Sequence, residues 1–155
     1  MDVYLAVKTL HILSATILFG TGIGIAFFMF RSSCTDNYQQ KLFASRTTVI
    51  ADYFFTFPSA IIQPVTGFWL IHLGGFNWSD KWLLITYIIY ALVGICWLPV
   101  VWIQIQLKKI LLDSISREIE LPSRYHRLFK IWFYLGWPAF IGLIVVFFLM
   151  VMKPI

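Results

Sequence analysis

Two histidines and two lysines are the residues of this sequence whose types could hold a cofactor. His11 lies well inside a long apolar run, roughly 12 Å below its start at a helical rise of 1.5 Å per residue, and Lys8 precedes it by one helical turn. His72 ends a second apolar run and Lys81 begins a third. A neutral imidazole is a common axial ligand of haem iron, and lysine is a common partner of carboxylates. We therefore treat these four residues as candidates for a cofactor site, with His11 as the metal ligand.

The helix face that carries His11 is lined mostly by small residues when successive residues are placed about 100° apart: Ala15, Leu18, Gly22 and Ala26. Small residues let either a neighbouring helix or a flat macrocycle approach closely. Two interpretations therefore stay open. In the first, the stripe packs against another helix, assisted by Gly20 and Gly24, and His11 bonds to a backbone carbonyl. In the second, His11 binds the iron of a haem that lies against the small residues.

Lys8, His72 and Lys81 also have two interpretations each. Lys8 and Lys81 either pair with the propionates of a porphyrin or extend their charged ends to the membrane surface. His72 precedes two glycines at the end of its apolar run, which is more typical of a hydrated interfacial residue than of a second iron ligand.

The composition shows what must position these residues. Of 155 residues, 60% are hydrophobic, 19% are aromatic and 12% are charged, whereas soluble domains have roughly 25% charged residues. A soluble enzyme could not expose so much apolar surface, and a disordered or nucleic-acid-binding chain would need far more charge. The sequence therefore predicts an integral membrane protein that contacts lipid and binds no nucleic acid.

The apolar residues form four uninterrupted runs, each long enough to cross a bilayer. We predict membrane-spanning helices over residues 3–30, 47–73, 81–107 and 128–152, joined by connections over 31–46, 74–80 and 108–127. Ser123 is placed to cap the fourth helix. The prediction is an all-α fold, a four-helix transmembrane bundle that forms a single domain over residues 1–155.

The basic residues predict the orientation of this bundle. Nine of the 12 lie at the first and third connections or beside them: Arg31, Lys41, Arg46, Lys108, Lys109, Arg117, Arg124, Arg127 and Lys130. Because cytoplasmic loops carry an excess of Lys and Arg, both termini are expected on the non-cytoplasmic side. His11, Lys8, His72 and Lys81 would then share the outer leaflet. The expected location is a bacterial inner membrane, as a multi-pass protein.

Polar residues inside the spans also need partners. Asp52 is the acid that falls within an apolar run, so we expect it to pair with a cation such as Arg46 or Lys130, with proton relay as the alternative. Gln63 and Gln104 are expected to bond across helices or to carbonyls freed at kinks. Two cysteines give no disulfide framework and no metal-ligand spacing.

Several short motifs resemble a known family. Lys8-Thr9-Leu10-His11 resembles the Lys-x-x-His opening of the membrane-embedded protoporphyrinogen IX oxidases of the HemJ type, four-helix bacterial proteins associated with haem b. Further pieces resemble that family in the same order along the chain: Pro58, Gly67-Phe68-Trp69-Leu70, Lys81, Tyr125-His126-Arg127 and Met152-Lys153-Pro154-Ile155. The resemblance implies haem b as cofactor, His11 as its ligand and Lys81 as a contact to substrate or propionate.

The chain departs from the HemJ pattern near the end of its first span. Where those oxidases have a Pro-Arg pair and a further His, this sequence has Ala26-Phe27 and, farther on, Arg31-Ser32. In this respect it is more similar to a related, uncharacterised bacterial family of predicted integral membrane proteins. The departure leaves it uncertain whether the protein is an enzyme.

Two functions from different classes are consistent with these observations. The first is a haem b or porphyrin-binding redox protein, or an oxidase of the protoporphyrinogen type that passes electrons from a porphyrin substrate to a quinone. The second is a non-enzymatic subunit or assembly factor that packs against a larger membrane complex or forms a homo-oligomer. The second axial ligand, the substrate and the electron acceptor are not specified by the sequence.

Overall fold

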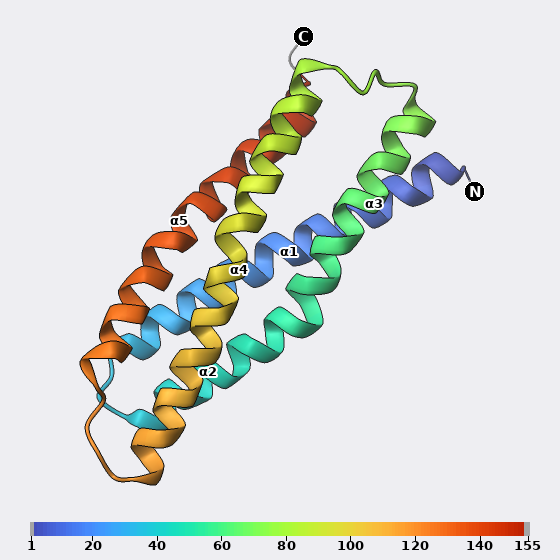
Figure 1. Cartoon of the computed structure of the whole chain (residues 1–155). Coiled ribbons are helices and arrows are strands. Elements are labelled where there is room, and N and C mark those ends of the chain that lie inside the picture. The colour runs from blue at the N-terminus through green and yellow to red at the C-terminus, as the bar shows by residue number, and fades with distance from the viewer. Residues whose placement is uncertain (1, 154–155) are drawn as a thin grey trace.

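The computed structural model describes residues 2–153, and this part of the chain is almost entirely helical (Figure 1). Its elements are α1 Val3–Ser33, α2 Tyr38–Ala51, the π-helix η1 Asp52–Thr56, α3 Phe57–Gly74, α4 Lys81–Ser116 and α5 Ser123–Met152. Because α2, η1 and α3 follow one another without a break, the chain forms four long helical segments. No strand occurs within residues 2–153. The predicted all-α class is confirmed.

Each of the four segments is long and apolar enough to cross a membrane: Val3–Ser33, Tyr38–Gly74, Lys81–Ser116 and Ser123–Met152. At 1.5 Å per residue they measure about 45 to 55 Å, whereas the hydrocarbon core of a bilayer is about 30 Å thick. The helices therefore extend beyond the hydrocarbon at their polar ends, and the prediction of four spanning helices is confirmed.

The connection predicted over residues 31–46 is wrong for most of its length. The structure leaves residues 34–37 as the link between α1 and α2, and α2 begins at Tyr38. The side chain of Asn37 accepts hydrogen bonds from the backbone N–H groups of Gln39 and Gln40, at 2.9 and 3.1 Å, and so caps this helix. A helix satisfies the hydrogen bonds of its own backbone in water as well as in lipid. The polar residues of the predicted connection therefore did not mean that the chain leaves the helical conformation there.

The third connection is also shorter than predicted, because α4 continues to Ser116 and α5 begins at Ser123. The residue at the N-cap position of α5 is Pro122, and no side chain caps this helix. The prediction that Ser123 caps it is therefore wrong. Proline at this position has no backbone N–H that needs a partner, which makes it compatible with a helix start.

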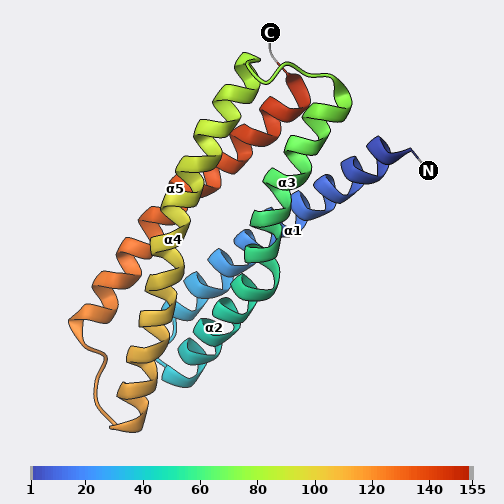
Figure 2. The same ribbon diagram turned by 45° about the vertical axis from the view of Figure 1, so that its right-hand side comes forward.

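The helices pack in pairs. Figures 1 and 2 show α4 and α5 side by side along most of their length, α1 crossing α3, and α2 against α4. Both described ends of the chain and the α3–α4 connection lie at one end of the bundle, which we call the terminal end. The α1–α2 and α4–α5 connections lie at the other, which we call the loop end.

The buried core is larger at the loop end. Its cluster contains Met29, Leu42, Ala44, Val100, Ile103, Leu107, Leu111, Tyr125, Leu128 and Trp132. The cluster near the terminal end contains Ile71, Trp82 and Leu83. Because α1 makes its main contact at the terminal end with α3, the region around His11 is built chiefly from these two helices.

Candidate functional site

His11 joins α1 to α3 through the hydroxyl of Thr66. The distance from His11 Nδ1 to Thr66 Oγ1 is 2.7 Å. Thr66 Oγ1 donates its own hydrogen to the carbonyl oxygen of Ile62 at 2.6 Å, so it accepts from the histidine. Nδ1 therefore carries the proton of the neutral ring. Sequence reasoning identified His11 but not Thr66; it offered a backbone carbonyl, and the backbone of Gln63 is a further hydrogen-bonding neighbour of the imidazole.

The other ring nitrogen of His11 is left with a lone pair. When Nδ1 of a neutral imidazole is protonated, Nε2 is an acceptor and a possible metal ligand. Nε2 makes no hydrogen bond to any residue within 2–153. Metal-binding histidines almost always donate their second N–H to an oxygen, which fixes the tautomer and the ring orientation. His11 has this arrangement on its Nδ1 side.

A second set of hydrogen bonds holds the backbone around His11. Gln63 Nε2 on α3 donates to the carbonyl oxygen of His11 at 2.7 Å and also contacts Ser14 Oγ. Ser14 Oγ donates to the same carbonyl at 3.1 Å. A Cβ atom on Gly67 would lie 3.4 Å from His11 Cε1, so the glycine lets α3 approach the ring. The prediction that Gln63 bonds across helices is confirmed.

The other three predicted site residues lie at the same end of the bundle but not against the ring. Lys8 is near the start of α1, His72 is in the last turn of α3, and Lys81 is the first residue of α4. All three side chains are exposed. In the described part of the chain none of them forms a hydrogen bond or ion pair with His11. Lys8 Nζ instead lies 5.8 Å from the ring centroid of Tyr4.

The three glycines of α1 do not share one face: at 100° per residue Gly22 lies about 20° from His11, whereas Gly20 and Gly24 lie about 180° and 220° from it, on the opposite side. A Cβ atom built on Gly20, Gly22 or Gly24 would meet nothing within 4 Å among the described residues. The interpretation that these glycines pack against a neighbouring helix of the same chain is therefore wrong. Leu18 is the member of the stripe that is buried. Gly20 and Gly22 are exposed, whereas Gly24 lines a cavity between α1 and α2.

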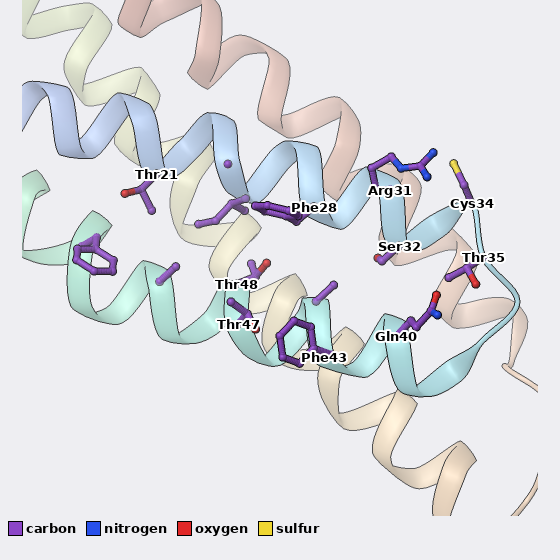
Figure 3. Close-up of a pocket in the computed structure, with 15 residues that line it drawn as sticks. Thr21, Phe28, Arg31, Ser32, Cys34, Thr35, Gln40, Phe43, Thr47 and Thr48 are labelled. Carbon is purple, nitrogen blue, oxygen red and sulfur yellow. The ribbon is translucent and has the colours of Figure 1, made fainter.

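The larger described cavity lies elsewhere, between α1 and α2 toward the loop end (Figure 3). Its volume is about 610 Å³. Phe28 and Arg31 line it from α1, and Phe43, Thr47 and Thr48 line it from α2. None of the four predicted site residues lines it. Sequence reasoning missed this cavity because its α2 wall was assigned in part to a loop.

Asp52 does not form the ion pair that was predicted for it. Across residues 2–153 the structure shows one ion pair, between Arg117 and Asp113 at 2.7 Å. Asp52 is the first residue of η1, and its side chain is 5% exposed. Arg46 and Lys130 are exposed and are not its partners. The prediction of a structural pair with either cation is therefore wrong.

The described residues contain no group of three or more His, Cys, Asp or Glu side chains that could hold a metal ion. A metal bound to His11 would therefore take most of its ligands from something other than these side chains. A porphyrin supplies four nitrogen ligands in one plane, so it fits a single protein ligand better than a bare ion does.

Comparisons with known proteins place the chain in a family without assigning an activity. Neither curated proteins nor solved structures give a match. Residues 5–154 match the family described as "Predicted integral membrane protein (DUF2269)". The match covers nearly the whole chain and agrees with the four apolar helices. The chain therefore belongs to the DUF2269 family of predicted integral membrane proteins.

Proposed function

We propose that this protein binds haem b, or a related porphyrin, through Nε2 of His11 at the terminal end of the bundle. The observation that carries the proposal is the hydrogen bond from His11 Nδ1 to Thr66 Oγ1, because it directs the free lone pair to Nε2. An imidazole fixed in this way needs no change of tautomer when iron binds.

The surroundings of His11 are compatible with a flat ligand on one side of the ring. The histidine is half-buried between α1 and α3. Gly22 lies farther along α1 on the same side as His11, and a Cβ atom built on it would meet nothing within 4 Å among the described residues. Lys8 and Lys81 are exposed cations near the terminal end, where propionate groups could reach them.

A haem held at His11 would supply one-electron redox chemistry. The resemblance to HemJ-type oxidases implies that the electron donor is a porphyrinogen and that the electron acceptor is a quinone. The proposal places the terminal end outside the cytoplasm of a bacterial inner membrane, because the basic residues gather at the loop end.

Absorption spectroscopy of the purified protein tests the proposal. Protein expressed with sufficient haem should show a Soret band, and His11→Ala should lose most of it. His126→Ala is the matched control, because His126 is exposed near the start of α5 at the loop end. Absence of a Soret band, or a band of equal intensity in His11→Ala, would refute haem binding at this residue. Complementation of a strain that lacks protoporphyrinogen oxidase then tests the oxidase activity separately.

A second function rests on a different observation. Gly20 and Gly24, on the side of α1 opposite His11, have the small-residue spacing that membrane helices use to pack closely, and a Cβ atom on either would meet nothing within 4 Å among the described residues. A subunit or assembly factor could use this face to bind a helix of a larger complex or a second copy of the chain. If this function is correct, the purified protein should have no chromophore and should co-purify with its partner. Gly20→Leu combined with Gly24→Leu should then abolish the co-purification.

A further inference from the structure

A buried polar cluster lies where η1 meets α4. Asp52 and Thr56 begin and end η1, and their side chains are 5% and 6% exposed. Gln104 of α4 is 1% exposed. Gln104, Thr56 and Trp97 are the side-chain hydrogen-bonding neighbours of the Asp52 carboxyl group. This cluster is separate from the His11 site and is not used by the proposed haem function.

Three oxygen atoms of this cluster are buried without a hydrogen-bond partner of good geometry: Asp52 Oδ2, Thr56 Oγ1 and Gln104 Oε1. A carboxylate oxygen and an amide oxygen are both acceptors, so neither can satisfy the other. A buried polar atom without a partner costs about 1 to 3 kcal/mol, and more when it is charged. Thr56, Trp97 and the Gln104 amide carry donors nearby, but Asp52 Oδ2 and Gln104 Oε1 still lack a positively charged or hydrogen-donating species at bonding distance.

No basic side chain supplies that species. The charged or titratable basic groups on the elements around η1 are Lys8, His11 and Arg31 on α1, Lys41 and Arg46 on α2, His72 on α3, and Lys81, Lys108 and Lys109 on α4. None of them forms an ion pair with Asp52. An ionised carboxylate that is buried and unpaired in a membrane is very costly, and such a group becomes neutral instead.

One proton bound to Asp52 would give hydrogen-bond partners to most of these unpartnered oxygens. A neutral carboxyl group has an O–H donor, and Gln104 Oε1 is an acceptor among its neighbours. The single bond from Asp52 Oδ2 to Gln104 Oε1 would give a partner to two of the three unpartnered oxygens. Thr56 can then donate its hydroxyl to the remaining carboxyl oxygen.

The backbone at Asp52 is also unusual. A π-helix is rare, and where one is found inside an α-helix it is frequently at a functional position. Here it covers Asp52 to Thr56, which are the residues that supply two of the unpartnered oxygens. The π-turn and the polar cluster are therefore two independent features of the same five residues.

A cavity passes close to the cluster, although Asp52, Thr56 and Gln104 are not among the residues that line it. The cavity between α1 and α2 is lined by Thr48, one helical turn before Asp52, and by Ala51, its immediate neighbour. Hydroxyl and amide side chains continue along the cavity toward the loop end, at Thr47, Ser32 and Gln40 (Figure 3). Such groups can hold water, and water can carry a proton to the wall next to Asp52.

We propose that Asp52 is a membrane-embedded proton-binding site, in which the neutral carboxyl group donates its proton to Gln104 Oε1 and exchanges it through the cavity at the loop end. The reaction is the binding and release of one proton at a carboxylate oxygen, with no change in oxidation state. Release leaves Asp52 charged and returns Gln104 to an unpartnered state, so the bound proton is the stable form.

Infrared spectroscopy of the protein in lipid vesicles at neutral pH tests the proposal. The wild type should show the carbonyl stretch of a protonated carboxylic acid, and labelling with carboxyl-¹³C aspartate should shift that band. Asp52→Asn should remove it. Asp113→Asn is the matched control, because Asp113 is an exposed, ion-paired acid of the same chain, and the band should remain. Gln104→Leu should move the band to higher frequency, because the hydrogen bond to the amide is lost.

Two further measurements separate a proton from a metal cation and test the route. Thermal stability should be equal in sodium chloride and in choline chloride, and Asp52→Asn should unfold at the wild-type temperature or above. In D₂O, Ala51→Leu should slow the isotope shift of the band, because the larger side chain narrows the cavity beside Asp52.

The absence of an aspartate-derived band in the labelled wild type would overturn the proposal. A stabilisation by sodium that Asp52→Asn abolishes would also overturn it, since a metal cation would then occupy the cluster. An unchanged exchange rate in Ala51→Leu would overturn the route.

Discussion

The hydroxyl of Tyr90 on α4 donates a hydrogen bond to the carbonyl oxygen of Ala60 on α3, at 2.8 Å. This carbonyl would normally accept from the backbone N–H of residue 64, but residue 64 is a proline. Tyr90 therefore supplies the donor that Pro64 lacks. The contact also fastens α3 to α4, two consecutive helices that otherwise touch each other sparsely.

Tyr90→Phe should lower the free energy of unfolding by about 0.5 to 1.5 kcal/mol, because it leaves the Ala60 carbonyl without a partner. Reversible unfolding in mixed detergent micelles would measure this. Tyr134→Phe is the control, since Tyr134 is 71% exposed, and it should change little.

The same hydrogen bond can be tested by a double-mutant cycle. Pro64→Ala restores a backbone N–H that can donate to Ala60, so the cost of Tyr90→Phe should nearly disappear in that background. An equal cost in both backgrounds would contradict the assignment of Tyr90 to the carbonyl freed by Pro64.

Gly142 and Gly136 on α5 should respond oppositely to alanine. A Cβ atom on Gly142 would lie 2.7 Å from Val93 Cγ2 and 3.2 Å from Ile89 Cγ2, so Gly142→Ala forces α4 and α5 apart. The expected loss is about 1 to 3 kcal/mol. A Cβ atom on Gly136 would meet nothing within 4 Å, so Gly136→Ala should be neutral or stabilising. Thermal unfolding of both variants measures the difference, and equal shifts would contradict the close packing at Gly142.

The four spans were predictable because hydrophobicity and length determine them directly. The helix boundaries at the loop end were not, since polar residues such as those of α2 form helix outside the hydrocarbon as readily as they form loops. The cap at Asn37 was the available signal for the start of α2.

The sites were predictable in part. The depth of His11 and the cross-helix bonding of Gln63 followed from the sequence. Thr66 did not, because a face of one helix does not specify which residue of another helix lies opposite it. The pairing of Asp52 with Arg46 failed for a geometric reason. Six residues at about 100° each place Arg46 about 120° around the helix from Asp52, on a different face.

Thr66→Val should weaken haem binding while the fold is retained. Without the hydroxyl, His11 Nδ1 loses its acceptor, and the ring is no longer held in the tautomer that presents Nε2. Loss of such a supporting hydrogen bond typically lowers metal affinity about 10- to 100-fold. Haem titration followed at the Soret band measures the change. Thr16→Val, at an exposed threonine of α1, is the control, and equal affinities in the two variants would contradict a positioning role for Thr66.

The orientation of the bundle can be read from its own cysteines. Cys34 is exposed at the loop end, where the basic residues gather, and Cys96 is half-buried in α4. With Cys96→Ser as background, a membrane-impermeant maleimide should label Cys34 in inside-out vesicles but not in sealed right-side-out vesicles, because the loop end is expected in the cytoplasm. In a chain that has serine at both native cysteine positions, Ser79→Cys in the exposed α3–α4 connection should give the opposite pattern. Labelling of Cys34 from the outside would place both termini in the cytoplasm, and with them the His11 site and the two lysines proposed to meet the propionates.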